Sequence, residues 1–381
     1  MSPQTDEAAH DSLVAQIGDI WSRTLRVSPI APDENFFDLG GDSLLAVGLF
    51  LEIERRMGIH LPITAIYDAP TIAELAKLLA GDTAKREFSP LVLLKPGDCD
   101  TPLFIVHGIG GTVMELSAIG RAIRIPAAVY ALQAQGVDGS LPALESVEEM
   151  ADLYLDHVRG VQPGGPYWLF GYSFGGLVAL EMARRLLHEN QEIAALILMD
   201  AFAHPATWPR TSRLKMRARR ALHLAMRHLR TPLRESVPAV VARLGAIARK
   251  RSDSTSRYRD WLLEQYPDLP PPLLRVREGG SAALSRYVPQ YYPGKVIFLR
   301  AAIRGAEFPE PEPIWRPLVR DVALHTVPGG HRTMVSEHAT SLAGQITACV
   351  LDASRRRAAR TACAMQMTST TTEPHLEPQP V

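Results

Sequence analysis

The chain has few cysteines and lacks the long apolar segments that direct proteins into membranes. Its 381 residues include only Cys99, Cys349 and Cys363, which lie far apart without paired spacing. That pattern argues against a disulfide framework or a zinc site and fits a protein of the reducing cytoplasm. No run of about 18 apolar residues occurs, so we expect no membrane span. The polar start MSPQTDEAAHDS lacks the apolar core of a signal peptide.

The chain also has no net charge, since 41 Lys and Arg residues balance 41 Asp and Glu residues. Composition therefore gives no reason to expect a nucleic-acid partner. The balance is uneven, because residues 1–82 hold 13 acidic and 5 basic residues, a net charge of −8, which leaves +8 for the remainder. We expect two units of opposite charge that attract each other or bind different partners.

Apolar residues at helical spacing fill the acidic N-terminal region. Spacings of three and four predict helices over 12–27 and 43–57, and a capping box that starts at Thr71 predicts another. We interpret residues 10–82 as a small all-α bundle. The polar segment 83–101, which contains proline and glycine, is interpreted as a linker.

A different pattern begins at residue 102, where short apolar runs alternate with helical stretches. The runs predicted as strands are 103–108, 128–133, 167–173, 195–200, 296–301 and 322–327. Apolar strands that alternate with helices indicate an α/β fold with a buried, mostly parallel sheet, here over 102–352. Residues 204–290 interrupt the alternation with helical, basic sequence that we expect to cover an active site. The tail 353–381 lacks apolar periodicity and is predicted to be disordered.

The sequence GYSFG at 171–175 lies between a predicted strand and a predicted helix. G-x-S-x-G in that setting is a nucleophile elbow, a tight turn that presents the serine at the carboxyl edge of the sheet. We therefore predict Ser173 as a nucleophile, with an ordinary glycine-rich turn as the alternative. The backbone N–H of Phe174, at the start of the helix, can face a developing oxyanion.

A serine nucleophile needs a base and an acid that orients it, and with this elbow the chain order is Ser, acid, His. His331 lies in a Pro-Gly-Gly loop after the last predicted strand, and we predict it as the base. Asp200 ends the strand that follows the elbow helix and is the favoured acid. The alternative is Glu307, with Glu310 and Glu312 nearby, in the loop after the next strand.

A second oxyanion donor is expected from the glycine-rich sequence VHGIGGTV at 106–113, which follows the first strand of this region. Its glycines let the backbone approach a substrate closely. We assign this role to the backbone N–H of Ile109. His107 is expected to support the loop rather than to take part in catalysis.

A second serine, Ser43, lies in the sequence LGGDSLL without a His or Lys within fifteen residues that could act as its base. It stands at the start of a predicted helix, where free N–H groups and the helix dipole stabilise a phosphate ester. Leu44, Leu45 and Val47 would form an adjoining apolar patch. The residues alone leave open whether Ser43 carries a phosphate-linked group or only caps the helix.

The segment around Ser43 resembles the carrier, or thiolation, domains of nonribosomal peptide and polyketide synthases. The similarity covers nearly all of 12–82 and includes LGGDSL, a short third helix and PTIAELA at the start of a fourth. It implies a four-helix carrier bundle. It also implies that a phosphopantetheinyl transferase attaches 4′-phosphopantetheine from coenzyme A to Ser43, and that the terminal thiol holds an acyl or peptidyl thioester.

Residues 102–352 resemble the α/β-hydrolase thioesterase domain that often follows such a carrier, with 204–290 as its helical lid. In that family the acid follows the strand that ends at Asp200. The resemblance implies a serine thioesterase that moves the acyl group from the Ser43 thioester to Ser173 and releases it by hydrolysis or cyclisation. The alternatives are an acyl-shuttling transferase between carriers and a non-enzymatic carrier with a docking hydrolase domain.

The chain has no adenylation, condensation or ketosynthase sequence, so we expect upstream synthase modules or carrier proteins to supply its acyl group. Met1 and the short polar lead suggest a free-standing offloading protein, with a piece excised from a longer chain as the alternative. Residues 210–251 hold 13 Lys and Arg residues and one acid, Glu235. This stretch is interpreted as a solvated lid face, a docking surface for an acidic carrier, or a surface for nucleic acid or anionic membrane.

Overall fold

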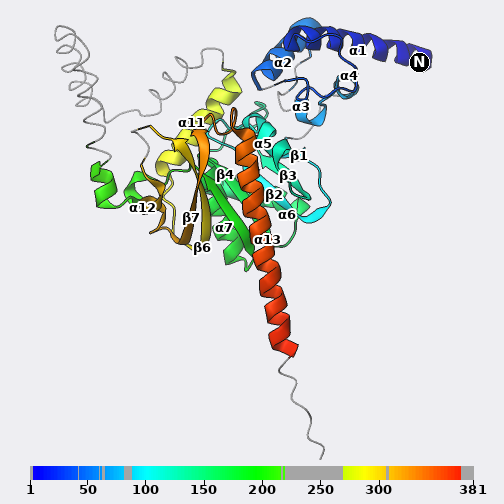
Figure 1. The fold of residues 1–381 in the computed structure, drawn as a ribbon. Helices are drawn as coiled ribbons and strands as arrows, with labels where there is room; N and C mark the ends of the chain where they lie inside the picture. Colours follow the sequence, from blue (N-terminus) through cyan, green and yellow to red (C-terminus); the bar gives the residue numbers. More distant parts are fainter. Residues whose placement is uncertain are drawn as a thin grey trace, which may run out of the picture.

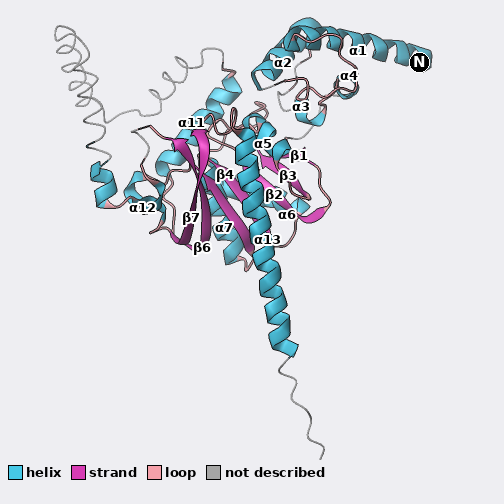
Figure 2. Cartoon of the chain, in the orientation of Figure 1, coloured by secondary structure: helices cyan, strands magenta, loops and turns pink. Residues whose placement is uncertain are grey.

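The protein is described by a computed structural model with an N-terminal helical unit and a larger unit built around a sheet (Figure 1). The described residues are 3–41, 43–59, 61, 65–80, 88–215, 218, 269–305 and 309–369. Figure 2 shows that strands occur in the larger unit, with helices packed around them. None of the helices in the described part of the chain combines the length and apolar character needed to span a bilayer.

The N-terminal unit is the all-α bundle predicted from the sequence. Its described helices are α1 (Pro3–Leu25), α2 (Ser43–Met57), α3 (Ala65–Asp68) and α4 (Ile72–Ala80). Trp21 of α1 and Phe36 of the following loop are fully buried and meet edge to face, with ring centroids 5.1 Å apart. The predicted capping box is present, since the Glu74 N–H donates to Thr71 Oγ1 and the Thr71 N–H donates to Glu74 Oε2, each at 3.2 Å.

The larger unit contains a seven-stranded sheet, within the described residues, in the order β1-β3-β2-β4-β5-β6-β7. The strands are β1 (Leu91–Lys95), β2 (Cys99–Val106), β3 (Ala127–Leu132), β4 (Tyr167–Tyr172), β5 (Ile193–Met199), β6 (Tyr292–Ile303) and β7 (Val319–Gly330). β1 pairs antiparallel with β3, and all the other pairings are parallel. The structure therefore confirms the mostly parallel sheet and all six strands predicted from residue 102 onward.

Helices cover both faces of the sheet. They are η2 (Met114–Leu116), α5 (Ser117–Ala122), α6 (Val147–Val161), α7 (Gly175–His188), η3 (Pro205–Thr207), α11 (Pro271–Arg286), α12 (Pro311–Trp315) and α13 (Ala339–Ser369). Side chains alternate across β2, since Phe104 and Val106 pack with α6 and α7, whereas Leu103 and Ile105 pack with α5 and α13. This alternation gives a three-layer fold in which the parallel strands are apolar on both faces.

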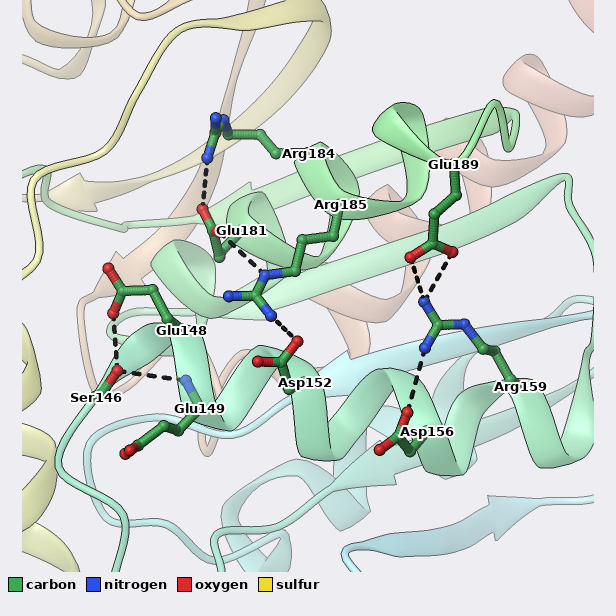
Figure 3. Close-up of polar contacts among 10 residues, drawn as sticks. All are labelled: Ser146, Glu148, Glu149, Asp152, Asp156, Arg159, Glu181, Arg184, Arg185 and Glu189. Atoms are coloured by element: carbon green, nitrogen blue, oxygen red, sulfur yellow. Dashed lines mark hydrogen bonds and ion pairs between the residues drawn. The ribbon is translucent and has the colours of Figure 1, made fainter.

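A polar network links α6 and α7 (Figure 3). Arg185 forms ion pairs with Glu181 one turn earlier on α7 and with Asp152 on α6. Arg184 also pairs with Glu181, with 2.8 Å between Nη1 and Oε2. The network fixes α6 against α7, and α7 is the helix that follows the elbow.

Two predicted boundaries are wrong. Residues 83–101 were expected to be a linker, but β1 begins at Leu91 and β2 at Cys99. The prolines that suggested a linker, Pro90 and Pro96, lie at the two ends of β1, an edge strand that tolerates proline at its limits.

The tail was predicted to be disordered from 353 to 381, but α13 continues to Ser369. The buried first half of α13 supplies the helix nucleus, so Ala and Arg residues extend it at little cost. Arg357 also donates to Glu192 Oε2 at 2.9 Å. Residues 370–381 lie outside the described part of the chain.

Of the predicted lid, 204–290, the structure describes η3 and α11 together with the residues that flank them. Residues 216–217 and 219–268 lie outside the described residues. The interpretations of the basic stretch 210–251 therefore remain predictions.

Candidate active site

The serine of the elbow lies where β4 turns into α7, and its backbone is held in a strained conformation. Ser173 has a φ of 54°, in the left-handed region that non-glycine residues rarely adopt. Its N–H donates to the carbonyl oxygen of Met199 at 2.8 Å, which ties the turn to β5. The neighbouring Gly171 leaves no room for a side chain, because a Cβ there would lie 2.4 Å from the carbonyl oxygen of Gly175. The turn therefore projects the Ser173 side chain at the carboxyl edge of the sheet.

Three side chains that are distant in the sequence form one hydrogen-bonded chain at that edge. Ser173 Oγ lies 3.0 Å from His331 Nε2, and His331 Nδ1 lies 2.9 Å from Asp200 Oδ2. Ser173 follows β4, Asp200 follows β5 and His331 follows β7. The structure thus brings together the residues that were predicted as nucleophile, acid and base, in the arrangement by which an imidazole activates a hydroxyl.

Asp200 is almost fully buried and is held in its ionised form. Burial opposes its charge, but the hydrogen bond from His331 and the charge of Arg304 outweigh that cost and hold the pKa of Asp200 below its ordinary value. Arg304 Nη1 lies 2.5 Å from Asp200 Oδ1, on the side of the carboxylate away from His331. Asp200 is therefore an anion that can orient the imidazole of His331.

Two of the alternative acids, Glu310 and Glu312, do not take this place. Glu310 pairs with Arg300 at 3.0 Å, and Glu312 pairs with Arg316 at 2.6 Å, both on partly or largely exposed surface. Glu307 lies outside the described residues.

Tyr172, at the end of β4, and Phe202, in the loop after β5, both pack on the imidazole of His331. The Tyr172 ring stacks on it, with centroids 5.5 Å apart and an interplanar angle of 30°. The Tyr172 hydroxyl also donates to the backbone carbonyl oxygen of His331 at 3.2 Å. The Phe202 ring lies tilted at 6.2 Å. The elbow motif marks the residue before the serine only as variable, so no sequence pattern indicates the role of Tyr172.

The loop after β2 packs directly against the elbow, as an oxyanion hole requires. A Cβ on Gly175 would lie 2.1 Å from the carbonyl oxygen of His107, so the two backbones are in contact. Ile109 of the loop and Phe174 of the elbow both lie against Gly280 of α11. Within the described residues, neither Ile109 nor Phe174 donates its backbone N–H to another group. Both N–H groups are therefore available for an oxyanion.

His107 supports this loop, as the sequence analysis expected. It is buried, with Nδ1 2.5 Å from the carbonyl oxygen of Gly108 and Nε2 2.6 Å from the hydroxyl of Tyr154. Burial lowers the pKa of His107 to about 4, so the ring is neutral near pH 7. Its nitrogens are both occupied, and it has no free acid–base role.

A carboxylate that was not predicted from the sequence, that of Glu115, lies beside the same loop. Glu115 Oε1 lies 2.8 Å from the position that a Cβ on Gly108 would take, and 3.9 Å from that of Gly110. Burial raises the pKa of Glu115, and the charge of Arg277 on α11 is the largest influence in the opposite direction. No motif marks this residue, because its place depends on how η2 folds back over the loop.

Ser43 is the first residue of α2, the position predicted for it. The loop before it is held by Gly41, whose N–H donates to the carbonyl oxygen of Phe36 at 2.9 Å. Gly41 also packs so closely on the Phe36 ring that a Cβ would lie 2.3 Å from it. The phosphate of 4′-phosphopantetheine fits this place, since a helix of this length presents free N–H groups and a positive dipole end at its first turn.

The helical unit contacts the larger unit through a small aromatic seam. The Arg121 guanidinium of α5 lies 4.5 Å above the ring centroid of Phe37, and Phe37 stacks on Tyr67 of α3 at 5.1 Å. Met114 of η2 packs into the apolar core of the helical unit. Asp38 is close enough to influence Arg121 electrostatically, which places one acid of the helical unit beside a basic residue of the other.

Comparison with known proteins gives two family matches that together cover most of the chain. Residues 101–349 match the thioesterase domain family, and residues 15–79 match the phosphopantetheine attachment site family. The chain is 38% identical over 186 residues to the malpinin synthetase of Mortierella alpina, covering 48% of this chain and 2% of the synthetase. It is 35% identical over 184 residues to a dimodular nonribosomal peptide synthase of Bacillus subtilis (strain 168), covering 48% of this chain and 8% of the synthase.

Among solved structures, a four-domain nonribosomal peptide synthetase in its holo form, bound to AMP and glycine, is similar with a TM-score of 0.54. The alignment covers 88% of this chain and 26% of that one at 24% identity, which supports the fold alone. The chain thus spans only a small part of the length of these relatives. Because the thioesterase match covers more than half of it, this chain belongs to the thioesterase domain family, and a match to the phosphopantetheine attachment site family precedes the thioesterase domain.

Proposed function

We propose that this protein receives an acyl or peptidyl thioester on 4′-phosphopantetheine attached to Ser43, transfers the acyl group to Ser173, and releases it by hydrolysis or cyclisation. The hydrogen-bonded chain Ser173–His331–Asp200 is the observation that carries the proposal. The carrier family supplies the cofactor, and the thioesterase family supplies the class of reaction. When it is bound, the pantetheine arm provides the thiol that holds the acyl group.

The hydrogen bonds among Ser173, His331 and Asp200 support the following first half of the reaction. His331 Nε2 takes the proton of Ser173 Oγ as the oxygen attacks the thioester carbonyl carbon. Asp200 accepts the Nδ1–H and stabilises the imidazolium. The N–H groups of Phe174 and Ile109 bind the oxyanion. His331 then returns the proton to the leaving sulfur as the C–S bond breaks, and an ester to Ser173 remains.

In the second half, His331 activates the group that attacks this ester. Water gives a free acid, whereas a hydroxyl or amine of the acyl chain itself gives a lactone or lactam. In both cases His331 takes the proton of the attacking group and donates it to Ser173 Oγ when the ester bond breaks. Both forms of release use the same residues.

The seam between the two units supports transfer within one chain. Met114 is the first residue of η2, and η2 directly follows the glycine-rich loop that contains Ile109. A carrier that packs on Met114 therefore stays close to this loop. Linking the donor and the nucleophile raises their effective concentration without any new contact. Upstream synthase modules or separate carriers supply the acyl group, and a phosphopantetheinyl transferase loads Ser43. The cytoplasmic location expected from the sequence stays a prediction.

Intact mass spectrometry of the full chain tests the proposal. Octanoyl-coenzyme A and a promiscuous phosphopantetheinyl transferase would load an octanoyl-pantetheine arm directly. We expect the wild-type chain to lose the octanoyl group with time, Ser173→Ala to retain it, and Ser43→Ala to gain no mass. Ser140→Ala, a change at an exposed serine, is the matched control and should behave as the wild type. Loading of Ser43→Ala, or release by Ser173→Ala at the wild-type rate, would contradict the proposal.

A further inference from the structure

A fourth side chain, Arg304, completes the hydrogen-bonded chain at the carboxyl edge of the sheet. Its Nη1 lies 2.5 Å from Asp200 Oδ1, while the other oxygen, Oδ2, lies 2.9 Å from His331 Nδ1. The backbone N–H of Ala301 also approaches Oδ1, at 3.4 Å. The two oxygens of Asp200 therefore have different partners, a cation on one and the imidazole on the other.

This pair is buried. The Asp200 side chain is 1% exposed and that of Arg304 is 10% exposed. A carboxylate taken out of water needs a compensating charge, and removal of one partner of a buried pair is costly because the other charge is left alone. His331 must stay neutral to accept the proton of Ser173, so it cannot supply that charge before the reaction begins. Arg304 supplies it at all times.

Arg304 is itself held in place on its other sides. Its Nη2 donates to the carbonyl oxygen of Pro309 at 2.7 Å, which ties it to the start of α12. Its guanidinium lies 5.6 Å from the ring centroid of Phe202, and Phe202 in turn packs on His331. The guanidinium is therefore fixed with respect to both the carboxylate and the imidazole.

We infer that Arg304 is a positioning residue of the active site, which keeps Asp200 ionised with Oδ2 facing His331 and which lowers the tendency of the Asp200–His331 pair to bind a proton. This inference rests on the proposed function, because it assigns a role within the same catalytic chain. A positive charge beside Asp200 offsets part of the negative charge that would otherwise favour the imidazolium. The pair then stays ready to accept the Ser173 proton at a lower pH than it would without Arg304.

Other ionisable groups lie near Asp200 and His331, and the test must separate their effects from the effect of Arg304. Tyr172 lies on the imidazole from β4, and burial raises its pKa. Glu115 of η2 and Arg332, which follows His331 in the chain, are close enough to influence each other electrostatically. None of these groups contacts Asp200 directly among the described residues, so replacing Arg304 removes the charge next to the carboxylate and leaves the others unchanged.

The test is the pH dependence of Ser173 labelling by phenylmethanesulfonyl fluoride, followed on the full chain by intact mass. In this reaction Ser173 Oγ bonds to sulfur, fluoride leaves, and the serine proton passes to His331, so no acyl substrate is needed. We expect the acid limb of the rate profile to move to higher pH by about 0.5 to 1 unit in Arg304→Gln. The sign follows because the Asp200–His331 pair binds its first proton more readily once the cation is gone, whichever member takes it. Arg304→Lys retains the charge and should keep the acid limb close to its wild-type position.

Arg184→Gln is the matched control. Arg184 forms a comparably buried pair with Glu181 (13% and 8% exposed), and both residues lie on α7 (Figure 3). It should lower the thermal midpoint without moving the acid limb. Two results would overturn the inference. One is that Arg304→Gln is labelled more slowly at every pH while its acid limb does not move, and the other is that Arg304→Lys shifts the limb as far as Arg304→Gln does. If the wild-type Ser173 were not labelled at all, the proposed function would fail, and the inference with it.

Discussion

The hydroxyl of Tyr172 and the backbone carbonyl of His331 are joined by a hydrogen bond of 3.2 Å, while the Tyr172 ring stacks on the imidazole of the same residue. The residue before the nucleophile therefore holds the loop that carries the base. Both contacts come from one side chain. One substitution can remove the hydrogen bond alone, and another can remove the hydrogen bond and the stacking together.

Tyr172→Phe removes the hydrogen bond and keeps the stacking. We expect kcat/KM for a thioester substrate to fall about threefold to tenfold, in line with a net hydrogen-bond contribution near 1 kcal/mol. Tyr172→Leu removes both contacts and should lower it further. Steady-state rates with an acyl N-acetylcysteamine thioester measure the effect. Equal activity of the two variants would show that stacking does not position His331.

Gly175→Ala tests the contact between the elbow and the oxyanion loop. An added Cβ would lie 2.1 Å from the carbonyl oxygen of His107, so the loop must move away from the elbow. Loss of one oxyanion donor costs on the order of 100-fold in kcat, and we expect a loss of at least that size. Gly160→Ala in α6 is the matched control, because a Cβ there meets nothing within 4 Å.

In contrast to Gly175→Ala, Gly160→Ala should keep full activity and raise stability by about 0.5–1 kcal/mol, since Ala favours the helix more than Gly. Urea unfolding and turnover of both variants give the two readings. Near-normal turnover of Gly175→Ala would contradict the close packing of loop and elbow.

His107 should make stability depend on pH in a defined window. Burial lowers its pKa to about 4 in the folded chain from an ordinary 6.5. The unfolded chain therefore binds the proton first as pH falls, and stability is lost from about pH 6.5 down to about pH 4. By the linkage relation this contribution is on the order of 3 kcal/mol.

Replacing the ring should flatten that dependence. We expect His107→Gln to be less stable than the wild type at pH 7 but to lose less stability between pH 7 and pH 5, measured by urea unfolding. His325→Gln, at an exposed position on β7, is the control and should keep the wild-type slope. An unchanged slope in His107→Gln would mean that another group governs this pH range.

The aromatic seam predicts a defect that is confined to transfer from the carrier. Arg121→Ala and Phe37→Leu each remove the cation–π contact at 4.5 Å, which is worth about 0.5–2 kcal/mol. We expect release of an octanoyl group from Ser43 to slow about threefold to tenfold, with labelling of Ser173 by phenylmethanesulfonyl fluoride unchanged. Arg316→Ala, which removes an exposed arginine directly after α12, should affect neither rate. An equal slowing of both rates would locate the defect in the active site rather than in the seam.

Much of the fold could be predicted from the sequence, because the sequence patterns that indicate it are local. The parallel strands are continuous apolar runs, and the elbow needs glycines at fixed positions around Ser173. These patterns depend on few neighbours. They predicted the α/β sheet and the all-α bundle, which the structure confirms, and the residues that it brings together at the carboxyl edge.

The parts that were missed depend on distant partners. β1 is short and bounded by prolines, and only its pairing with β3 makes it a strand. The end of α13 lacks an apolar face, and it continues because the buried half has already formed the helix. Arg304 and Glu115 reach the site across loops that have no motif, so only the folded chain reveals that they face Asp200 and Gly108.

The early start of the sheet also limits how far the carrier can travel. α4 ends at Ala80, and the described backbone resumes at Phe88, just before the edge strand β1. Eight peptide steps span at most about 28 Å when fully extended. The bundle is therefore tethered within that distance of one border of the sheet, and an enzyme that loads Ser43 must bind beside the thioesterase domain.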